Sequence, residues 1–386
     1  MIYLDNASTT QVDPEVVEAM MPYLTEQYGN PGTIYSFGRD AKKAVEKARA
    51  QVATLIGAKP EQIIFTSGGT EANNMVFSSL VDKLKANNKT EIVSTAIEHD
   101  SVIKSIENMC IKLGFHSHYV CPNAQGIVNI DDIISCINEK TGIVSVMYVN
   151  NEIGSENPVA EIGNYCKSHN ILFHTDCVQA AGSHEIDVEK IGCDFLSISS
   201  HKIHGVKGIG ALYVRDKSSL SPFIHGGDKQ EFGLRGGTEN VPAIVAFGKA
   251  CEIAMSKQHE TDVITSSLKQ IFYACLVNKL KESGLDNVVH INGDLIIKHG
   301  KVLNLRFDQV DSETLLLMLD AKGICISAGS ACRSQESEPS RVLLMLGLAP
   351  EDARNSVRVS FSRMNTEEEI EEAAKAMADC VRILHK

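Results

Sequence analysis

The hydrophobic and polar positions change rhythm along the 386 residues of the chain. Over the first two-thirds, short apolar runs rich in β-branched residues alternate with amphipathic stretches such as 71–86 and 159–168. Such short runs are typical of buried strands, and a 3.6-residue period is typical of helices. The alternation predicts an α/β fold with a mostly parallel sheet flanked by helices. The expected strands cover residues 63–66, 91–95, 118–120, 143–148, 171–174, 195–198 and 210–214.

After about residue 250 the pattern becomes that of a smaller α+β domain. One helical stretch over 243–283 leads into it. The elements expected next are strands near 288–291 and 302–307, a helix over 313–321, and strands around 324–327 and 357–360. We therefore expect a large domain over residues 12–255 and a small domain formed by residues 1–11 and 256–386.

The charge of the chain limits the ligands that it can bind. The sequence has 37 basic and 49 acidic residues, which gives a formal net charge of -12. Nucleic-acid binding needs a basic surface, so we expect no direct nucleic-acid binding. The sequence has no long uncharged apolar window and starts without the basic and apolar regions of a signal peptide. These features predict a protein that is neither inserted in a membrane nor secreted.

The eleven cysteines are scattered along the chain, and none forms a C-x-x-C pair. In an intracellular protein this spacing indicates reduced thiols, most of them buried. The ligand spacing of a structural zinc site is also missing. We therefore expect a cytoplasmic protein without a resident metal.

Small residues follow the first strand of the predicted sheet, where Thr66-Ser-Gly-Gly-Thr-Glu leads into a helix. Glycines at such a junction let backbone N–H groups approach an anion at the helix N-terminus. The alternative is a plain strand-to-helix turn, and the Gly-Lys-Ser/Thr ending of a P-loop is missing. The segment is a candidate phosphate site. The charged residues at other strand ends strengthen this prediction.

Two charged residues come at the ends of later apolar runs. Asp176 would be poorly solvated there, and a protonated pyridine nitrogen is one cation that could pair with it. Lys202 follows another buried strand, and Schiff-base lysines need the depressed pKa that partial burial supplies. A helix N-cap for Asp176 and a solvent-reaching head group for Lys202 are the alternatives.

Three further candidates lie in predicted loops. His99 could stack on an aromatic cofactor or shuttle protons, although a lone histidine is commonly structural. Asn151 could donate a hydrogen bond to a ring oxygen, or it could serve only the turn. Cys332 lies among small and polar residues typical of an exposed loop, and the neighbouring Arg333 would favour its nucleophilic thiolate. An incidental surface thiol is the alternative for Cys332.

The combined motifs resemble the NifS/IscS-type cysteine desulfurases of the class V aminotransferase group, which have the pyridoxal-phosphate (PLP) transferase fold type I. The resemblance runs nearly end to end. It is carried by Tyr3-Leu-Asp-Asn-Ala-Ser-Thr-Thr, Gly29-Asn-Pro, Thr66-Ser-Gly-Gly-Thr-Glu, Asn150-Asn-Glu-Ile-Gly, Ser200-His-Lys, Arg235-Gly-Gly-Thr-Glu-Asn and Ser327-Ala-Gly-Ser-Ala-Cys. The last motif resembles the group of these enzymes that has a long cysteine-bearing loop.

The resemblance implies a PLP-dependent sulfurtransferase that acts on L-cysteine as a homodimer. Sulfur would leave as a persulfide on Cys332 and pass to an acceptor protein, in iron–sulfur cluster assembly or another thiolation pathway, while L-alanine is released. Cys332 would also be able to ligate an iron–sulfur cluster transiently. A PLP aminotransferase, a β-eliminating lyase and a docking subunit with weak turnover are the alternatives.

The resemblance also implies a role for each candidate residue. The phosphate would be held by Gly69, Thr70, Ser199 and His201, with Thr238 reaching in from the partner subunit. Around the ring, His99 would stack and act in proton transfer, Asp176 would pair with the nitrogen, and Asn151 and Gln179 would lie near the ring oxygen. Lys202 would bind the cofactor covalently and remove the substrate Cα proton, and Arg358, with Asn151, would bind the substrate carboxylate.

The chain departs from the family pattern at a few positions. Tyr35 stands where a histidine is usual, Val206 replaces a proline, and Asn157 stands where glutamine is common. The run Gly226-Gly-Asp-Lys-Gln-Glu, with Asp228 and Lys229, is one residue longer than usual. None of these positions matches a proposed chemical group, so we expect them to affect rate or partner choice.

Overall fold

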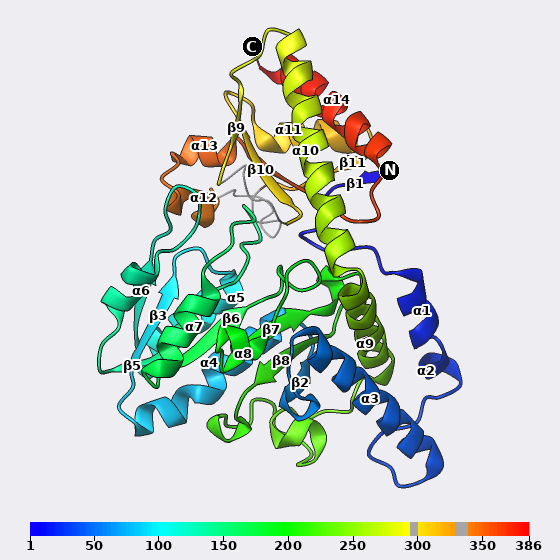
Figure 1. Cartoon of the computed structure of the whole chain (residues 1–386), viewed down its shortest axis with the longest axis vertical. Helices are drawn as coiled ribbons and strands as arrows, with labels where there is room; N and C mark the ends of the chain where they lie inside the picture. The colour runs from blue at the N-terminus through cyan, green and yellow to red at the C-terminus, as the bar shows by residue number, and fades with distance from the viewer. Residues whose placement is uncertain (294–299, 329–338, 386) are drawn as a thin grey trace.

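The computed structural model describes residues 1–293, 300–328 and 339–385. It has a large lower part built on one sheet and a smaller upper part, joined along one side by helices (Figure 1). The strands of the large sheet are β2 (Ile63–Thr66), β3 (Glu91–Thr95), β4 (His116–Val120), β5 (Thr141–Ser145), β6 (Leu172–Asp176), β7 (Phe195–Ser199) and β8 (Gly210–Val214).

The large sheet is mostly parallel, as the sequence predicts. Its strand order is β2-β8-β7-β6-β5-β3-β4, and β8 runs antiparallel to both of its neighbours. The other pairs are parallel, so the carboxyl ends of β3, β5, β6 and β7 meet at one edge. Open α/β sheets bind ligands at that edge.

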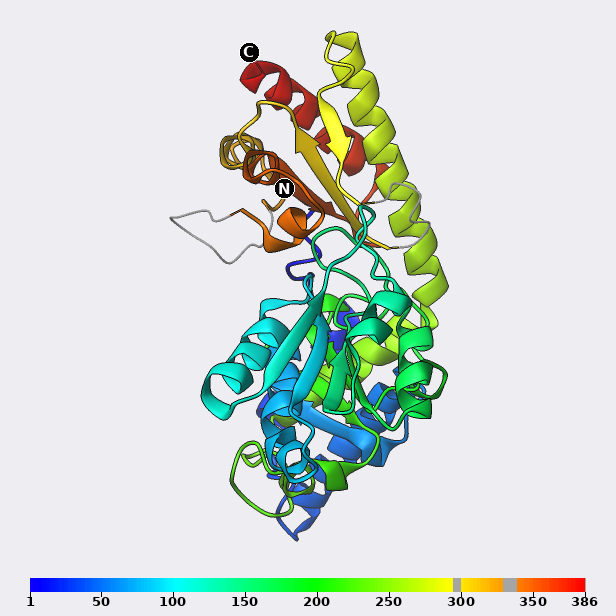
Figure 2. The same cartoon turned by 90° about the vertical axis from the view of Figure 1, so that its left-hand side faces the viewer.

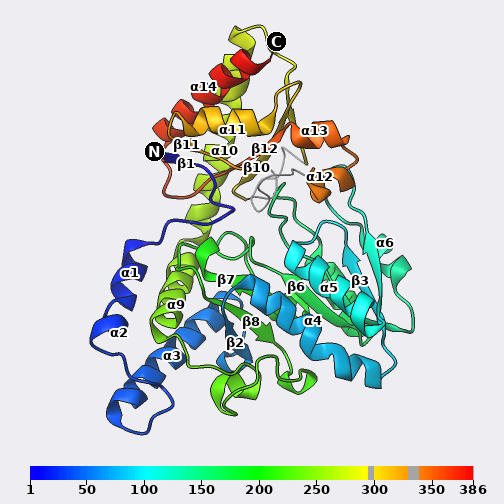
Figure 3. The same ribbon diagram turned by 180° about the vertical axis from the view of Figure 1, so that it is seen from behind.

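Helices cover both faces of this sheet. One face carries α7 (Val159–Ser168) and α8 (Val188–Ile191), and the opposite face, seen from behind, carries α4 (Gly69–Ala86) and α5 (Asp100–Leu113) (Figures 1 and 3). The remaining helices of the large part are α1 (Pro14–Met20), α2 (Pro22–Thr25), α3 (Ser36–Leu55), α6 (Ile130–Cys136) and α9 (Val241–Ser256). Short 3₁₀ turns include η2 (Ser200–Lys202) and η4 (Gln230–Gly233).

The small part is built on an antiparallel sheet of β12 (Ser356–Ser360), β10 (Val302–Phe307) and β9 (Val289–Ile291). Its helices are α10 (Gln258–Glu282), α11 (Ser312–Asp320), α12 (Arg341–Met345), α13 (Pro350–Arg354) and α14 (Glu367–Leu384). Helix α14 packs against α10 and α11, beside the sheet (Figure 2). A separate parallel pair joins β1 (Ile2–Tyr3) to β11 (Ile324–Cys325), which brings the first residues of the chain into this part.

The expected helix over 243–283 is wrong in one respect, because the structure breaks it at Lys257 between α9 and α10. The apolar side chains of α9, such as Phe247, pack in the core beside the large sheet. Those of α10, such as Phe272, pack in the small part. One straight helix does not satisfy both cores, and the polar run around Lys257 contains no glycine or proline to mark the break.

The two largest hydrophobic cores of the described residues lie on either side of Lys257. One contains residues between Val16 and Ala254, and the other combines Ile2 and Leu4 with residues from Leu268 onward. Separate cores support the expected division into 12–255 and 1–11 with 256–386, which stays a prediction. In the part of the chain that the structure describes, every helix is too short or too polar to cross a membrane.

Candidate active site

The candidate residues gather at the edge where the parallel strands end. Asp176 is the last residue of β6, and Ser199 is the last residue of β7. The turn η2 follows β7 at once and carries His201 and Lys202. Helix α5 begins beside His99, its N-cap residue, directly after β3. Neighbouring strand ends therefore bring together residues that lie far apart in the sequence.

One end of the site is a cup of about 410 Å³ at the start of α4. It is lined by Ser8, Thr9, Ser67, Gly68, Gly69, Thr70, Glu71, Ser199, His201, Lys207 and Gly208. The N-cap residue of α4, Gly68, has a φ of 154° and no side chain to cap the helix. A Cβ atom on Gly69 would lie 2.6 Å from Val178 Cγ2, so this position needs glycine. The predicted phosphate residues Gly69, Thr70, Ser199 and His201 all line this cup.

The polar groups of the cup suit an anion such as phosphate. Ser199 is 2% exposed, and its hydroxyl has no hydrogen-bond partner among the described residues. A buried polar group without a partner is costly, and a phosphate oxygen would satisfy it. Burial, with a smaller contribution from the charges of Lys202, Lys207 and Lys301, lowers the pKa of His201 to about 4. At neutral pH the cup therefore offers a neutral imidazole, hydroxyls and the N-terminus of α4.

The other end of the site is centred on the buried carboxylate of Asp176, which is 5% exposed. Its Oδ1 accepts a hydrogen bond from the Val178 N–H at 2.9 Å, and its Oδ2 accepts one from Asn73 Nδ2 at 2.8 Å. No described helix begins at Asp176, so it does not serve as an N-cap. A carboxylate fixed in this way suits a cationic ring nitrogen.

His99 is exposed and caps α5. Its Nδ1 lies 3.1 Å from the Ser101 N–H and 2.8 Å from Ser101 Oγ. The structural alternative for this histidine therefore holds, since its ring caps a helix. The same contacts leave the rest of the ring exposed at the carboxyl edge of the sheet.

Lys202 is held by the first residues of the chain. Its Nζ donates hydrogen bonds to the carbonyl oxygens of Ala7 at 2.5 Å and Ser8 at 2.7 Å. Gln179 Nε2 donates to the same Ala7 oxygen at 2.9 Å, while Gln179 Oε1 is buried without a partner among the described residues. The contacts show that this lysine head group is hydrogen-bonded inside the site, although the residue is only half-buried.

Arg358 lies on β12 and reaches the same N-terminal segment. Its Nη2 donates to Asp5 Oδ1 at 2.8 Å and to Ser8 Oγ at 2.6 Å, and its Nη1 donates to the Asn151 carbonyl at 2.9 Å. The side chain is 3% exposed. Asn151 thus contributes its backbone to the site, while the neighbouring Asn150 side chain holds the turn by accepting from the Glu152 and Ile153 N–H groups. A buried guanidinium that already holds one carboxylate is suited to bind another.

A second lysine lies behind Lys202. Lys301 Nζ donates to the Lys202 carbonyl at 3.1 Å. Burial lowers the pKa of Lys301 to about 7, and the charges of Lys202 and Arg358 act in the same direction. Within the described ranges, Lys301 forms no salt bridge.

Sequence reasoning missed several residues of the site. These are Asp5, Ala7, Ser8, Thr9, Asn73, Ser101 and Lys301. The first four lie in the Tyr3–Thr10 motif, which signalled the family but not a contact with Lys202. Asn73 sits one helical turn after Thr70, so its spacing from the cup was the available signal for it.

Two predicted site residues are not placed beside the cup. Thr238 is exposed on the loop between η4 and α9 and does not line the cup of its own chain. Cys332 lies outside the described residues. Among the departures, Tyr35 is exposed, and Asn157 is buried, accepting from the Val128 N–H and donating to the Met147 carbonyl. Neither Tyr35 nor Asn157 lines the cup.

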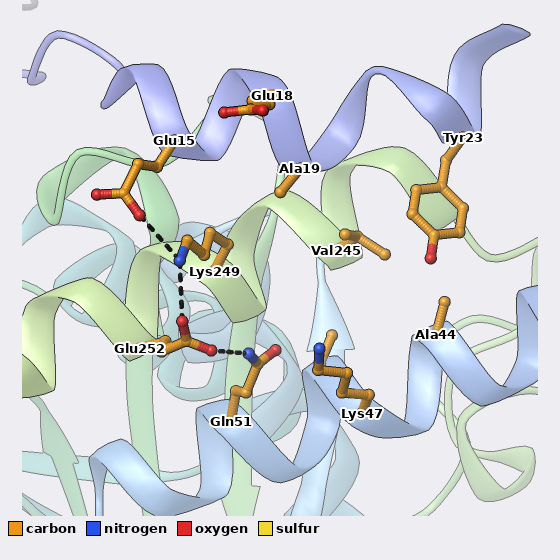
Figure 4. A pocket seen from close by; sticks show the side chains of 11 residues that line it. Glu15, Glu18, Ala19, Tyr23, Ala44, Lys47, Gln51, Val245, Lys249 and Glu252 are labelled. Carbon is orange, nitrogen blue, oxygen red and sulfur yellow. Dashed lines mark hydrogen bonds and ion pairs between the residues drawn. The ribbon is translucent and has the colours of Figure 1, made fainter.

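A separate groove of about 380 Å³ lies between α1, α3 and α9 (Figure 4). Lys249 there pairs with Glu15 at 3.0 Å and Glu252 at 2.9 Å, and Gln51 donates to Glu252. The groove is thus lined by polar groups that bind one another. None of the predicted site residues lines it.

Comparisons with known proteins show the family of the chain. Residues 2–372 match the model of the family described as aminotransferase class-V. A Methanosarcina thermophila protein named cysteine desulfurase IscS is 40% identical over 386 residues, which covers 99% of this chain and 92% of that one. A solved structure of a NifS-like protein is similar with a TM-score of 0.89 at 34% identity, covering 99% of this chain and 100% of the other. Another, SspA in complex with cysteine, has a TM-score of 0.79 at 32% identity, with 95% and 100% covered. The chain therefore belongs to the class V aminotransferases, among the NifS/IscS-type cysteine desulfurases.

Proposed function

We propose that the chain is a PLP-dependent cysteine desulfurase that uses Lys202, Asp176, His99 and Arg358 on L-cysteine and collects the sulfur on Cys332. The observation that carries this proposal is the position of Lys202. Its turn η2 begins directly after Ser199, which lines the cup (called the phosphate cup from here on). Lys202 Nζ and Arg358 Nη2 both donate hydrogen bonds to Ser8, to its carbonyl oxygen and its hydroxyl respectively. The Lys202 amine therefore lies between the cup, which suits an anion, and the guanidinium of Arg358.

The residues present fit PLP at both of its ends. Ser199 supplies a buried hydroxyl without a partner in the described chain, and Gly68 and Gly69 open the N-terminus of α4 to phosphate. Asp176 supplies a fixed carboxylate for the ring nitrogen, and His99 supplies a ring that can stack on the cofactor. When bound, PLP supplies an electron sink for negative charge that develops at the substrate Cα.

The protein groups then orient L-cysteine and move its protons. Arg358 binds the substrate carboxylate through its guanidinium, which already donates one hydrogen bond to the Asp5 carboxylate. The Lys202 amine takes the Cα proton, and a neutral amine is needed for that step. His99 is the second proton-transfer group, on the exposed side of the site.

Sulfur transfer completes the reaction. The Cys332 thiolate attacks the substrate Sγ, so that a new S–S bond forms while the Cβ–Sγ bond breaks. The electron pair of the broken bond stays with the carbon fragment, which gains one proton at Cβ, regains one at Cα and leaves as L-alanine. The persulfide on Cys332 then passes to a thiol of an acceptor protein, in iron–sulfur cluster assembly or another thiolation pathway.

A homodimer would complete the phosphate cup by placing Thr238 of one subunit at the cup of the other. Support comes from large apolar side chains exposed along one segment near the start of the chain, which are Met21, Leu24, Tyr28, Ile34, Tyr35 and Phe37. Such patches commonly mark protein interfaces. A cytoplasmic location is supported by the ten described cysteines, all of which are free thiols.

The proposal is tested by comparing three cysteine and lysine variants. Lys202→Ala is expected to lose the absorbance band of the lysine-bound cofactor. Cys332→Ser is expected to keep that band and lose alanine formation from L-cysteine, whereas the matched control Cys121→Ser, at an exposed described thiol, keeps both. Full alanine formation by Cys332→Ser would overturn the sulfur-transfer step and leave a lyase or an aminotransferase.

A further inference from the structure

A buried amide lies between Asp176 and Ser101, at the end of the site where the PLP ring is proposed to bind, which we call the ring end. Asn73 lies on α4 and is 1% exposed. Its Nδ2 lies 2.8 Å from Asp176 Oδ2, at the end of β6, and 2.8 Å from Ser101 Oγ, in the first turn of α5. One side chain therefore contacts groups on two other elements.

The direction of these hydrogen bonds follows from the chemistry of the groups. A carboxylate only accepts hydrogen bonds, so the amide nitrogen of Asn73 must face Asp176. This nitrogen has two hydrogens, and the second one points to Ser101 Oγ. Asn73 Oδ1 is left buried with no partner among the described residues. The unpaired oxygen lowers the stability of the fold, while both N–H groups of the amide are hydrogen-bonded.

The orientation of Asn73 decides where the proton on His99 lies. Ser101 Oγ accepts from Asn73, so its own hydrogen is available to donate to His99 Nδ1 at 2.8 Å. The Ser101 backbone N–H, which can only donate, also points to His99 Nδ1 at 3.1 Å. A nitrogen that accepts two hydrogen bonds carries no proton, so the proton of the neutral ring is on Nε2.

We infer that Asn73 and Ser101 are positioning residues that fix His99 as the Nε2–H tautomer and hold it in register with the Asp176 carboxylate. The catalytic role of His99 in this inference rests on the proposed function. With its proton on Nε2, the resting His99 presents a hydrogen-bond donor from its outer nitrogen. The neutral ring therefore orients cofactor or substrate by donating a hydrogen bond from Nε2, and it gives up that proton only from the imidazolium form, with Nδ1 protonated as well.

The inference explains why an amide is needed at position 73. An aspartate there would place a second carboxylate beside Asp176, and like charges at this distance repel. A leucine would fill the space but would leave Ser101 Oγ free to turn its hydrogen away from His99. Ser101→Ala would leave the backbone N–H as the sole donor to Nδ1.

The first measurement is the ¹⁵N spectrum of the histidine rings in the cofactor-loaded protein, with His99 assigned through His99→Gln. The wild type is expected to show an unprotonated Nδ1 and a protonated Nε2. Ser101→Ala and Asn73→Leu are expected to shift the ring toward a mixture of tautomers, while Ser101→Thr, which keeps the hydroxyl, restores the wild-type pattern. Asn87→Ala, at an exposed asparagine that ends the same helix, is the matched control.

The second measurement separates kcat from KM for L-cysteine. Ser101→Ala is expected to lower kcat about fivefold, the scale of one lost hydrogen bond, with KM changed less than twofold. Thermal melting of each variant shows whether it is folded. A wild-type ring with its proton on Nδ1, or an unchanged tautomer in both Ser101→Ala and Asn73→Leu, would overturn the inference. A wild type with the Nε2–H ring but without alanine formation would refute only the proposed function.

Discussion

The two ends of the site hold their ligand groups by different means. The phosphate cup consists mainly of backbone, glycine and hydroxyl groups at the start of α4 and the end of β7. The ring end consists of the buried side chains Asp176 and Asn73, joined through Ser101 to His99. In the proposed function, the cup would recognise an anion by shape and by N–H direction, whereas the ring end would depend on the identity and protonation of each side chain.

This difference predicts unequal tolerance to substitution. A side chain removed from the cup leaves the helix N-terminus in place, while a Cβ atom added at Gly69 collides with Val178 and one added at the neighbouring Gly210 collides with backbone. At the ring end, removing one group leaves its buried partners without hydrogen bonds. Four measurements test this contrast, beginning with the one for which we expect the largest effect.

Asp176→Asn should lower kcat at least about 100-fold, the scale seen when one preorganised electrostatic group is lost. The amide keeps the shape of the side chain but no longer pairs with a protonated ring nitrogen. Cofactor content, measured by absorbance, should remain above half of the wild-type value because the cup is intact. A loss of less than about fivefold in kcat would remove the distinction between the two ends.

Gly210→Ala tests the backbone of the cup. A Cβ atom on Gly210 would lie 2.7 Å from Cα of Gly68, which lines the cup, and 2.7 Å from the Ile198 carbonyl oxygen. We expect the affinity for PLP to fall about tenfold, the effect of roughly 1.4 kcal/mol. Gly32→Ala, whose added carbon would meet only the Asn30 side chain, is the control. Equal PLP titration curves for the two variants would contradict a cup built on backbone contacts.

Ser199→Ala should act in opposite directions with and without PLP. In the cofactor-free protein it removes a buried hydroxyl that has no partner in the described structure, so the melting temperature should stay equal or rise. In the loaded protein it removes a donor to phosphate, and affinity for PLP should fall about two- to fivefold. A lower melting temperature of the cofactor-free variant would show that the hydroxyl serves the fold alone.

Glu98→Gln tests the pH dependence of the ring end. Burial raises the pKa of Glu98 to about 8, and the charge of Asp176 contributes to this rise. Between the ordinary carboxyl pKa and about 8, the unfolded chain is ionised while the folded one keeps its proton. The stability contributed by Glu98 is therefore lost as pH rises through this range, by up to about 1 kcal/mol per pH unit.

The wild-type urea midpoint should therefore fall faster between pH 5 and pH 8 than that of Glu98→Gln, pH values chosen to span roughly this window. Asp100→Asn, at the exposed carboxylate two residues away, is the matched control. Parallel midpoint curves for wild type and Glu98→Gln would show that this carboxyl is already ionised in the folded protein.

How much the sequence predicts differs between the two ends as well. The runs at 63–66, 91–95, 210–214 and 302–307 match β2, β3, β8 and β10, because short apolar runs with sharp polar ends determine strands locally. The cup was predictable for the same reason, since residues 66–71 are contiguous. The Asn73–Ser101 contact joins two helices and depends on their packing, so no local pattern could reveal it. The break at Lys257 likewise depends on two cores rather than on a helix-breaking residue.

The contacts of the N-terminal segment can form only after much of the chain has been synthesised. Ala7 and Ser8 hold Lys202, while Asp5 pairs with Arg358 and bridges to Ser360, and β1 pairs with β11. Residues that leave the ribosome among the first thus wait for partners that lie between about 194 and 355 positions later in the chain. A nascent chain can complete the large sheet and the cup early. The Lys202 amine and the Arg358 guanidinium come together only when translation is almost finished.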